Sequence, residues 1–206
     1  MRTSSPPRLV VRPAQVGDSD VVAEIVGDAL RDKYAPALGD AALDGIAALA
    51  RWEIADVASS HHWLAELDGR PAGVVHLAVG MDGFRGFCGT LAREVGWPRA
   101  IRATLVLSTL SHGNLAPDEA YIEELAVAPW ARRQGVAKAL LATCEAEARR
   151  HDRGRLTLWV TITNAAARPL YAGAGFREVR RRRWIVGRML FHAPGAILME
   201  RALTPR

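Results

Sequence analysis

The stretch that most constrains the fold is residues 121–142, YIEELAVAPWARRQGVAKALLA. Its apolar start predicts a β-strand, and the spacing of apolar residues after Gly135 predicts an amphipathic helix. A turn of small and cationic residues, 132–137, joins the two elements. Such a turn presents free backbone N–H groups and the positive end of the helix dipole, which together suit a diphosphate. We therefore expect a phosphate-binding site at this turn.

Composition favours one domain over residues 1–206, because half of the 206 residues are apolar and can build one sizeable core. Cys88 and Cys144 lie far apart and form no C-x-x-C pair, so we expect no metal, no redox chemistry and a cytoplasmic location. The sequence contains no run of 18 apolar residues, so it predicts no membrane span. The net charge of +5 comes almost wholly from scattered arginines, which does not favour nucleic acid as a partner.

Strand and helix patterns alternate along the rest of the chain. Expected strands are residues 9–11, 63–67, 72–79, 121–127, 156–162, 176–183 and 197–202. Expected helices are residues 21–30, 41–57, 101–110, 134–150 and a short one that starts near Ala167, since Pro169 fits only a first helical turn. Asp68-Gly69 between two apolar runs is a strong hairpin signal. This order predicts the α/β class, with an α+β mixed sheet and helices on both faces.

Residues 80–118 form a long connection with glycines clustered near its start. Long connections in compact domains are usually functional or partly disordered. We interpret this one as an inserted loop and helix. It either walls a substrate pocket or only covers the sheet.

Two sequence blocks resemble the GCN5-related N-acetyltransferase (GNAT) superfamily. The first is Arg132-Arg133-Gln134-Gly135-Val136-Ala137 after a strand, which is similar to the family pattern Arg/Gln-x-x-Gly-x-Gly/Ala. The second is Asn164 at the end of the next strand, followed by Leu170-Tyr171 and Gly175-Phe176. Both blocks occur in the family's order within residues 121–179. The resemblance implies a central, mostly antiparallel mixed sheet of about seven strands.

The resemblance also implies an activity, the transfer of an acetyl group from acetyl-CoA to a primary amine of an unidentified acceptor. The backbone near the turn would hold the coenzyme A diphosphate, and the strand before it would pair with the pantetheine arm. The residues expected to contact the cosubstrate are Leu125, Ala126, Val127, Arg132, Arg133, Gln134, Gly135, Val136, Ala137, Lys138, Asn164 and Tyr171. Asn164 could instead only cap the short helix that follows it.

Acyl transfer to an amine needs a base, because an amine of pKa about 10.4 is almost fully protonated at neutral pH. Glu123 and Glu124 lie on the expected strand, and adjacent strand residues point to opposite faces, so we expect only one of them to face the cleft. We prefer Glu123 and keep Glu124 in reserve. Tyr171 matches the family tyrosine beside the thioester sulfur and could act as general acid, or it could be a core residue.

Other features suggest less. His61 and His62 lack metal-ligand companions at useful spacing, so we expect a surface pair. Residues 180–183 are all arginine and predict a solvated edge strand, although they could bind an acidic partner. On helix 134–150 we expect a buried Cys144 and four charged residues facing water, namely Glu145, Glu147, Arg149 and Arg150.

A second function stays open at this point, a regulatory module that binds acyl-CoA without turnover. No membrane partner is expected, and the chain could form a homodimer.

Overall fold

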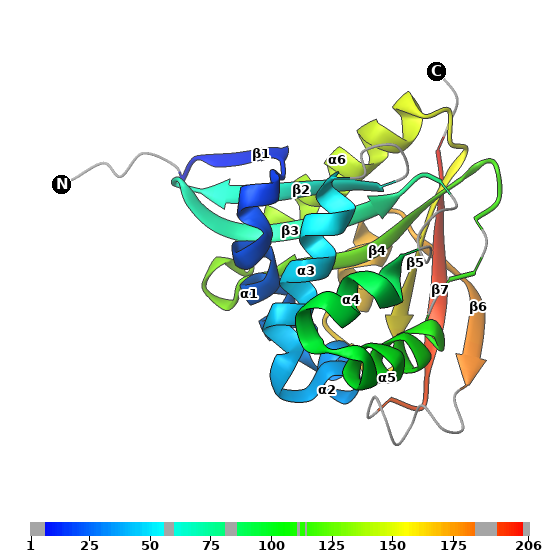
Figure 1. Cartoon of the computed structure of the whole chain (residues 1–206). Helices are drawn as coiled ribbons and strands as arrows, with labels where there is room; N and C mark the ends of the chain where they lie inside the picture. The colour runs from blue at the N-terminus through cyan, green and yellow to red at the C-terminus, as the bar shows by residue number, and fades with distance from the viewer. Residues whose placement is uncertain are drawn as a thin grey trace.

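The computed structural model describes residues 7–55, 60–80, 86–110, 112–113, 115–183 and 193–203. Its centre is a seven-stranded sheet in the order β1-β2-β3-β4-β5-β7-β6 (Figure 1). The strands are β1 Leu9–Pro13, β2 Ser60–Leu67, β3 Arg70–Ala78, β4 Glu119–Val127, β5 Arg155–Thr161, β6 Arg177–Arg183 and β7 Gly195–Ala202. Each neighbouring pair is antiparallel except β4 and β5, which run parallel. The predicted fold class is confirmed.

Helices cover both faces of this sheet (Figure 1). The α-helices are α1 Ser19–Ala29, α2 Arg31–Leu38, α3 Ala42–Ala55, α4 Phe87–Val95, α5 Trp97–Ser108, α6 Val136–Arg150 and α7 Ala167–Gly173. Short 3-10 helices lie at Val16–Asp18, Gly39–Ala41 and Pro129–Ala131. Helix α7 starts at Ala167, so the sequence prediction for Pro169 is confirmed. None of the helices in the described ranges is both long and apolar enough to cross a membrane.

The alternation of side chains along β2 divides the core into two parts. Trp63 and Ala65 belong to the cluster that packs against α6. Leu64, between them, belongs to the cluster built with helices α1 to α5. Cys144 of α6 is fully buried in the first cluster, as predicted. The sheet is therefore buried on both faces at its centre, and its strands read as nearly continuous apolar runs.

The N-terminal half contains one helix that the sequence did not predict. Helix α2 has a weak apolar pattern and contains Pro36, which removes a backbone donor from the helix. Residues 80–118 also differ from the expected loop and single helix, because they form two helices, α4 and α5. These pack mainly on α2 and α3 rather than on the sheet. Tertiary packing of short amphipathic faces outweighs weak local preference here.

The turn between β2 and β3 and the edge strand β6 follow the sequence closely. Asp68 and Gly69 both have positive φ angles, 53° and 76°, as the predicted two-residue hairpin turn requires. Strand β6 is at the sheet edge and all seven of its residues are exposed. The arginine run at residues 180–183 thus lies on a solvated edge strand, as predicted, and such charge opposes pairing with another chain.

Candidate active site

A cleft opens where the two central strands separate. Parallel pairing of β4 with β5 covers only Glu119–Ile122 and Arg155–Leu158. Strand β4 continues to Val127 and β5 to Thr161, so the β4 edge that faces β5 has no strand partner beyond Ile122 in the described chain. A cavity of about 920 Å³ lies between them and extends to the turn before α6. Free main-chain groups along this edge can pair with an extended ligand arm.

The turn before α6 forms one end of this cavity. Arg133 and Gly135 have positive φ angles of 66° and 85°, and Gly135 occupies the N-cap position of α6. No hydrogen bond found within the described residues uses the N–H groups of residues 133–138. Such unpaired amides at a helix start form a nest for an anion. The predicted helix start at Gln134 is two residues early, because the left-handed residues at 133 and 135 interrupt the helix.

The cations of the turn are not all equivalent. The Arg132 Nε donates to the Val127 carbonyl at 3.4 Å, and the Gln134 side chain donates to the Trp130 carbonyl at 2.9 Å. Arg133 and Lys138 are exposed and line the cavity. Among the described residues neither has an ion-pair partner, so both cations are available to a phosphate.

A bulge in β4 changes the prediction for the two glutamates. In the β3–β4 ladder His76 pairs with Glu124 and Leu77 pairs with Ile122, so Glu123 is an extra residue. A bulge suspends the strict alternation of faces. Both Glu123 and Glu124 consequently line the cavity, and the expectation that only one of them faces the cleft is wrong.

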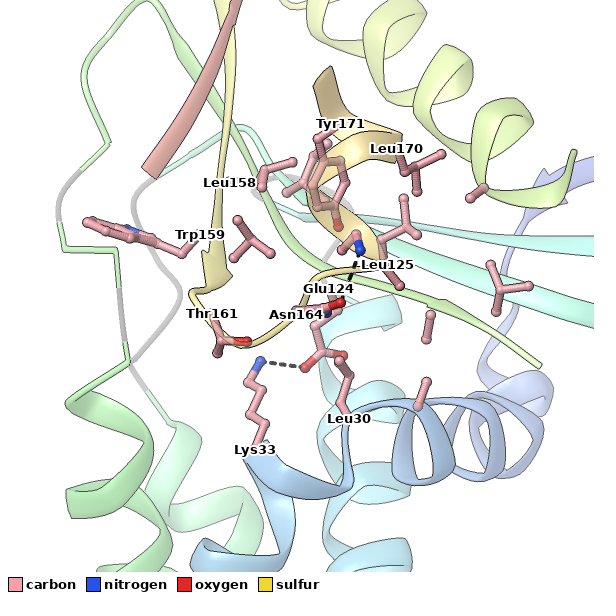
Figure 2. A pocket seen from close by; sticks show the side chains of 18 of the residues that line it. Leu30, Lys33, Glu124, Leu125, Leu158, Trp159, Thr161, Asn164, Leu170 and Tyr171 are labelled. Atoms are coloured by element: carbon pink, nitrogen blue, oxygen red, sulfur yellow. Dashed lines mark hydrogen bonds and ion pairs between the residues drawn. The ribbon is translucent and has the colours of Figure 1, made fainter. Parts of the chain in front are cut away.

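Glu124 is held by groups from α2. Its Oε1 accepts from the Lys33 ammonium at 2.7 Å (Figure 2) and also from the Tyr34 hydroxyl. Burial would raise the pKa of the Glu124 carboxyl, but the Lys33 charge and these two hydrogen bonds outweigh burial and lower the pKa. Glu124 is therefore an ionised anchor for α2, with one oxygen occupied.

Glu123 has the opposite environment. Its side chain retains 36% exposure, and desolvation raises the pKa of its carboxyl above the usual value, with nearby Lys33 opposing the shift. Its partner in the described chain is His76 of β3, whose Nδ1 lies 3.4 Å from Glu123 Oε2. A partly exposed carboxyl with a raised pKa is better suited to accept a proton than Glu124.

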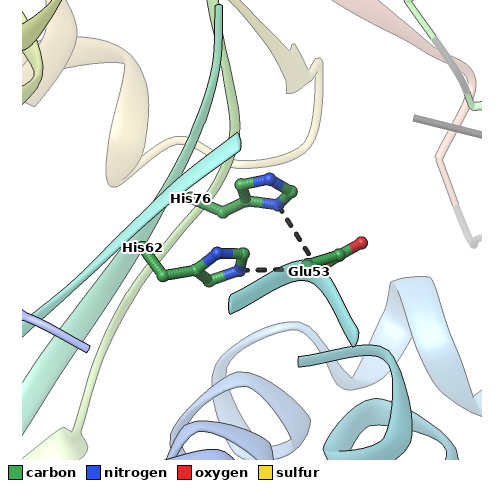
Figure 3. Close-up of side chains that lie close together, drawn as sticks. All are labelled: Glu53, His62 and His76. Atoms are coloured by element: carbon green, nitrogen blue, oxygen red, sulfur yellow. Dashed lines mark ion pairs between the residues drawn. The ribbon is translucent and has the colours of Figure 1, made fainter. Parts of the chain in front are cut away.

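Behind Glu123 lies a buried cluster of Glu53, His62 and His76 (Figure 3). The two rings stack at 4.0 Å, and His62 Nε2 and His76 Nδ1 lie 3.4 Å and 3.7 Å from the same oxygen, Glu53 Oε2. Burial, with the neighbouring His62 second, lowers the pKa of His76 to about 3, so the ring is neutral at pH 7. His62 is buried, so the expected surface pair at 61–62 is wrong.

The second sequence block lines the other side of the cleft. Tyr171 is buried and its ring packs edge-on against Phe176 at 5.9 Å. Its hydroxyl makes no hydrogen bond within the described part of the chain and points into the cavity (Figure 2). Burial raises the pKa of Tyr171 to about 12. Asn164 lines the same cavity, and its Oδ1 accepts from the Ala167 N–H at 3.0 Å, so it does cap α7.

Sequence reasoning missed the groups that surround the two glutamates, namely Lys33, Tyr34, Glu53 and His76. Lys33 and Tyr34 lie on α2, whose weak pattern gave no signal. The insert contributes Leu110 to the cavity. It therefore supplies part of the wall, while most of its apolar residues pack on other helices.

The sequence carries the family assignment. The model of the Acetyltransferase (GNAT) family matches residues 27–176. The chain belongs to this family. It is accordingly an acyltransferase, and the resemblance of residues 121–179 to GNAT motifs extends over most of the chain.

Solved GNAT structures share the fold. The ribosomal-protein-S18-alanine N-acetyltransferase of Escherichia coli superposes with a TM-score of 0.60 at 18% identity, over 97% of this chain and 96% of that one. The YncA protein of Salmonella typhimurium with its cofactor acetyl-CoA gives 0.66 at 18% identity, over 96% and 95%. The PaiA N-acetyltransferase of Thermoplasma acidophilum in complex with coenzyme A gives 0.62 at 14% identity, over 95% and 99%. No curated protein matches the chain.

Proposed function

We propose that this GNAT protein transfers the acetyl group of acetyl-CoA directly to a primary amine. The observation that carries the proposal is the cleft itself. One continuous cavity joins the unpaired edge of β4, the free amides at 133–138 and the carboxyl of Glu123. It thus combines a site for an extended thioester ligand with a base.

The residues at the turn fit coenzyme A. Six successive N–H groups, from Arg133 to Lys138, have no acceptor in the described chain and can hold the diphosphate. At Gly135 the absent side chain leaves the backbone open to close approach. Leu125 and Val127 would pair with the pantetheine arm, with Asn164 beside it. Acetyl-CoA supplies the activated acyl group.

Glu123 acts as the base in this proposal. It takes the proton of the incoming ammonium, directly or through a water, and the raised pKa of its carboxyl brings it nearer to neutral pH. The neutral His76 ring can donate its Nδ1–H to Glu123 and so orients it. Glu124 positions α2 through Lys33 and Tyr34 and takes no proton.

Tyr171 stabilises the leaving thiolate. With its pKa raised to about 12, full transfer of its proton to a thiolate of pKa about 8.5 is uphill by about 5 kcal/mol. Tyr171 therefore donates a hydrogen bond rather than a proton before the product leaves.

The Tyr171→Phe variant is expected to lower kcat about 10- to 100-fold, because a hydrogen bond to a charged group contributes about 1.5–3 kcal/mol. The KM for acetyl-CoA and the melting temperature should change little, since phenylalanine fills the same buried space. Steady-state kinetics and thermal unfolding measure both. An unchanged kcat would contradict the proposed hydrogen bond to the thiolate and leave Tyr171 with only a packing role in the core.

The pH profile tests the base. Because the pKa of Glu123 is raised above its usual value near 4.5, kcat/KM should be lost at low pH and rise as pH increases through that raised pKa. When kcat/KM is measured with two amines whose own pKa values differ by about two units, the midpoint of this rise should stay at the same pH. A limb that only follows the amine's pKa, or one that persists in Glu123→Gln, would contradict the assignment.

Thiol release from acetyl-CoA, measured with a panel of amines, tests the function as a whole. An enzyme releases thiol with at least one amine. A non-catalytic acyl-CoA-binding module binds the ligand in calorimetry but leaves it intact with every acceptor. Absence of acetyl-CoA binding would remove both proposals.

Other features of the proposal follow from the sequence. We propose a single domain that works in the cytoplasm and binds neither nucleic acid nor membrane. For nucleic acid, the proposal predicts that binding is absent or insensitive to salt, whereas binding that falls steeply with salt would contradict it. Light scattering tests whether the protein forms a homodimer.

A further inference from the structure

The C-terminal end of α6 meets β2 through three side chains outside the cleft. They are His61 of β2, Glu147 of α6 and His151 just after it, here called the α6–β2 cluster. Each offers one ligand atom, a ring nitrogen or a carboxylate oxygen, and these atoms lie within 4.8 Å of one another.

The backbone explains how these residues meet. His61 and His62 are adjacent on β2, so they point to opposite faces of the sheet. His62 reaches Glu53 of α3, whereas His61 lies beside His151 with ring centroids 4.9 Å apart. Glu147 and His151 are four residues apart, which places them on one side of the helix.

The inward position of Glu147 differs from the expectation that it faces water, since only 7% of the residue is exposed. Its two oxygens have different neighbours. Oε1 lies 3.2 Å from His151 Nε2, and Oε2 lies 3.2 Å from the Arg150 guanidinium. The Nε2 of His61 is buried and has no hydrogen-bond partner. A buried polar atom without a partner costs free energy and calls for an explanation.

We propose that the α6–β2 cluster binds a zinc ion through His61, Glu147 Oε1 and His151. Two imidazoles and one carboxylate with an open fourth position are a usual set for zinc, whereas magnesium and calcium take oxygen ligands. His151 Nε2 and Glu147 Oε1 are hydrogen-bonded at 3.2 Å, a separation close to that of two ligands on a tetrahedral zinc, about 3.4 Å. A ring nitrogen of His61, within 4.8 Å of both other ligand atoms, supplies the third ligand.

The surroundings favour this role. Arg150 fixes Oε2 of Glu147 from outside, an orienting contact typical of metal sites. Oε1 hydrogen-bonds to His151 Nε2 and would exchange that bond for the ion. The His151 side chain is 35% exposed, so water can reach the fourth position. Helix α6 has 15 residues, which puts this end about 22 Å from the phosphate-binding turn. The ion therefore joins α6 to β2 and takes no part in acetyl transfer.

The cluster of Glu53, His62 and His76 is a weaker zinc candidate. Its rings stack nearly parallel, 21° apart, and both nitrogens approach a single carboxylate oxygen. His76 Nδ1 also lies 3.4 Å from Glu123 Oε2, so this cluster belongs to the surroundings of the proposed base.

Zinc titration of the chelator-treated full chain, without coenzyme A, tests the proposal. Calorimetry should give one ion per chain, and zinc at about 100 times the Kd should raise the melting temperature by about 5–10 °C. Cobalt(II) should give the visible absorption of a tetrahedral site. The His151→Ala variant, altered at a partly exposed position, should fold and lose at least about 100-fold in zinc affinity.

His61→Ala should lose affinity to a similar extent. Glu145→Gln, which changes a carboxylate on the same helix that pairs with Arg149 and Arg201, should keep wild-type affinity. The proposal is overturned if zinc does not bind. It is equally overturned if both histidine variants bind zinc as tightly as the wild type, because the ion would then lie elsewhere.

Discussion

Replacing Glu123 by glutamine is expected to lower kcat for amine acetylation by about 10²-fold or more, the usual contribution of a positioned general base. Glutamine keeps the shape of the side chain but cannot take the amine's proton. The KM for acetyl-CoA should stay nearly unchanged, because Glu123 lies outside the turn at 133–138 that would hold the diphosphate. Initial rates of thiol release at saturating acetyl-CoA measure the loss.

Glu124→Gln is the matched control on the neighbouring residue. It removes a carboxylate that already accepts from Lys33 and Tyr34, so we expect lower stability and only a small loss of kcat for a folded variant. If Glu124→Gln abolishes turnover while Glu123→Gln does not, the two roles are reversed. Acceptors of lower pKa add a second check, because they need the base less and should rescue Glu123→Gln in part.

Gly135→Asp is expected to weaken acetyl-CoA binding by at least about 100-fold. Gly135 has a φ angle of 85°, a conformation that costs a residue with a side chain about 1–2 kcal/mol. The new carboxylate would also stand among the amides that hold the diphosphate and repel it. The strain is present with and without ligand and lowers stability, whereas the blocked and repelling anion site accounts for the loss of affinity, about 2.7 kcal/mol or 100-fold in the Kd measured by calorimetry.

Two variants separate the causes of that loss. Gly135→Ala introduces the backbone strain alone, since a Cβ there meets nothing within 4 Å, and should weaken binding about tenfold or less. Gly69→Asp places the same residue at a positive φ of 76° in the β2–β3 turn, away from the cleft. It should reduce stability and leave acetyl-CoA affinity unchanged. Wild-type affinity in Gly135→Asp would exclude the turn as the phosphate site.

Local signals in the sequence predicted much of the fold. The Asp68-Gly69 turn, the period of two along residues 156–162 and the helical period of residues 136–150 each depend on neighbours a few positions away. The anion-binding turn is also a local feature, because its conformation depends on Gly135 and on the start of α6. Helix α2 was missed for the same reason, since it has little local pattern and is held by contacts with α3 and α5.

The environment of the two glutamates depends on contacts between distant segments. A two-residue hairpin turn without irregularity would place His61 opposite His76, but a bulge at Ala65/Glu66 shifts the register and pairs His62 with His76. A second bulge at His76/Leu77 brings Glu123 into the cleft beside Glu124. The first bulge lies between Pro71 and Gly73 of β3, two residue types that are common at bulges. No glycine or proline marks the second bulge, so no sequence pattern predicts that Glu123 is the extra residue.

The sequence by itself therefore determined the order of the strands and of most helices, the family and the turn that can hold a diphosphate, because short-range periodicity and turn chemistry encode each of these. Only the tertiary structure decided that Glu124 pairs with Lys33 and that Glu123 lies beside His76. It also decided that the adjacent His62 and His61 approach different carboxylates, those of Glu53 and Glu147. The physical reason is that a shift of one residue between strands exchanges the faces of every side chain beyond it. That shift is fixed by packing across the whole sheet.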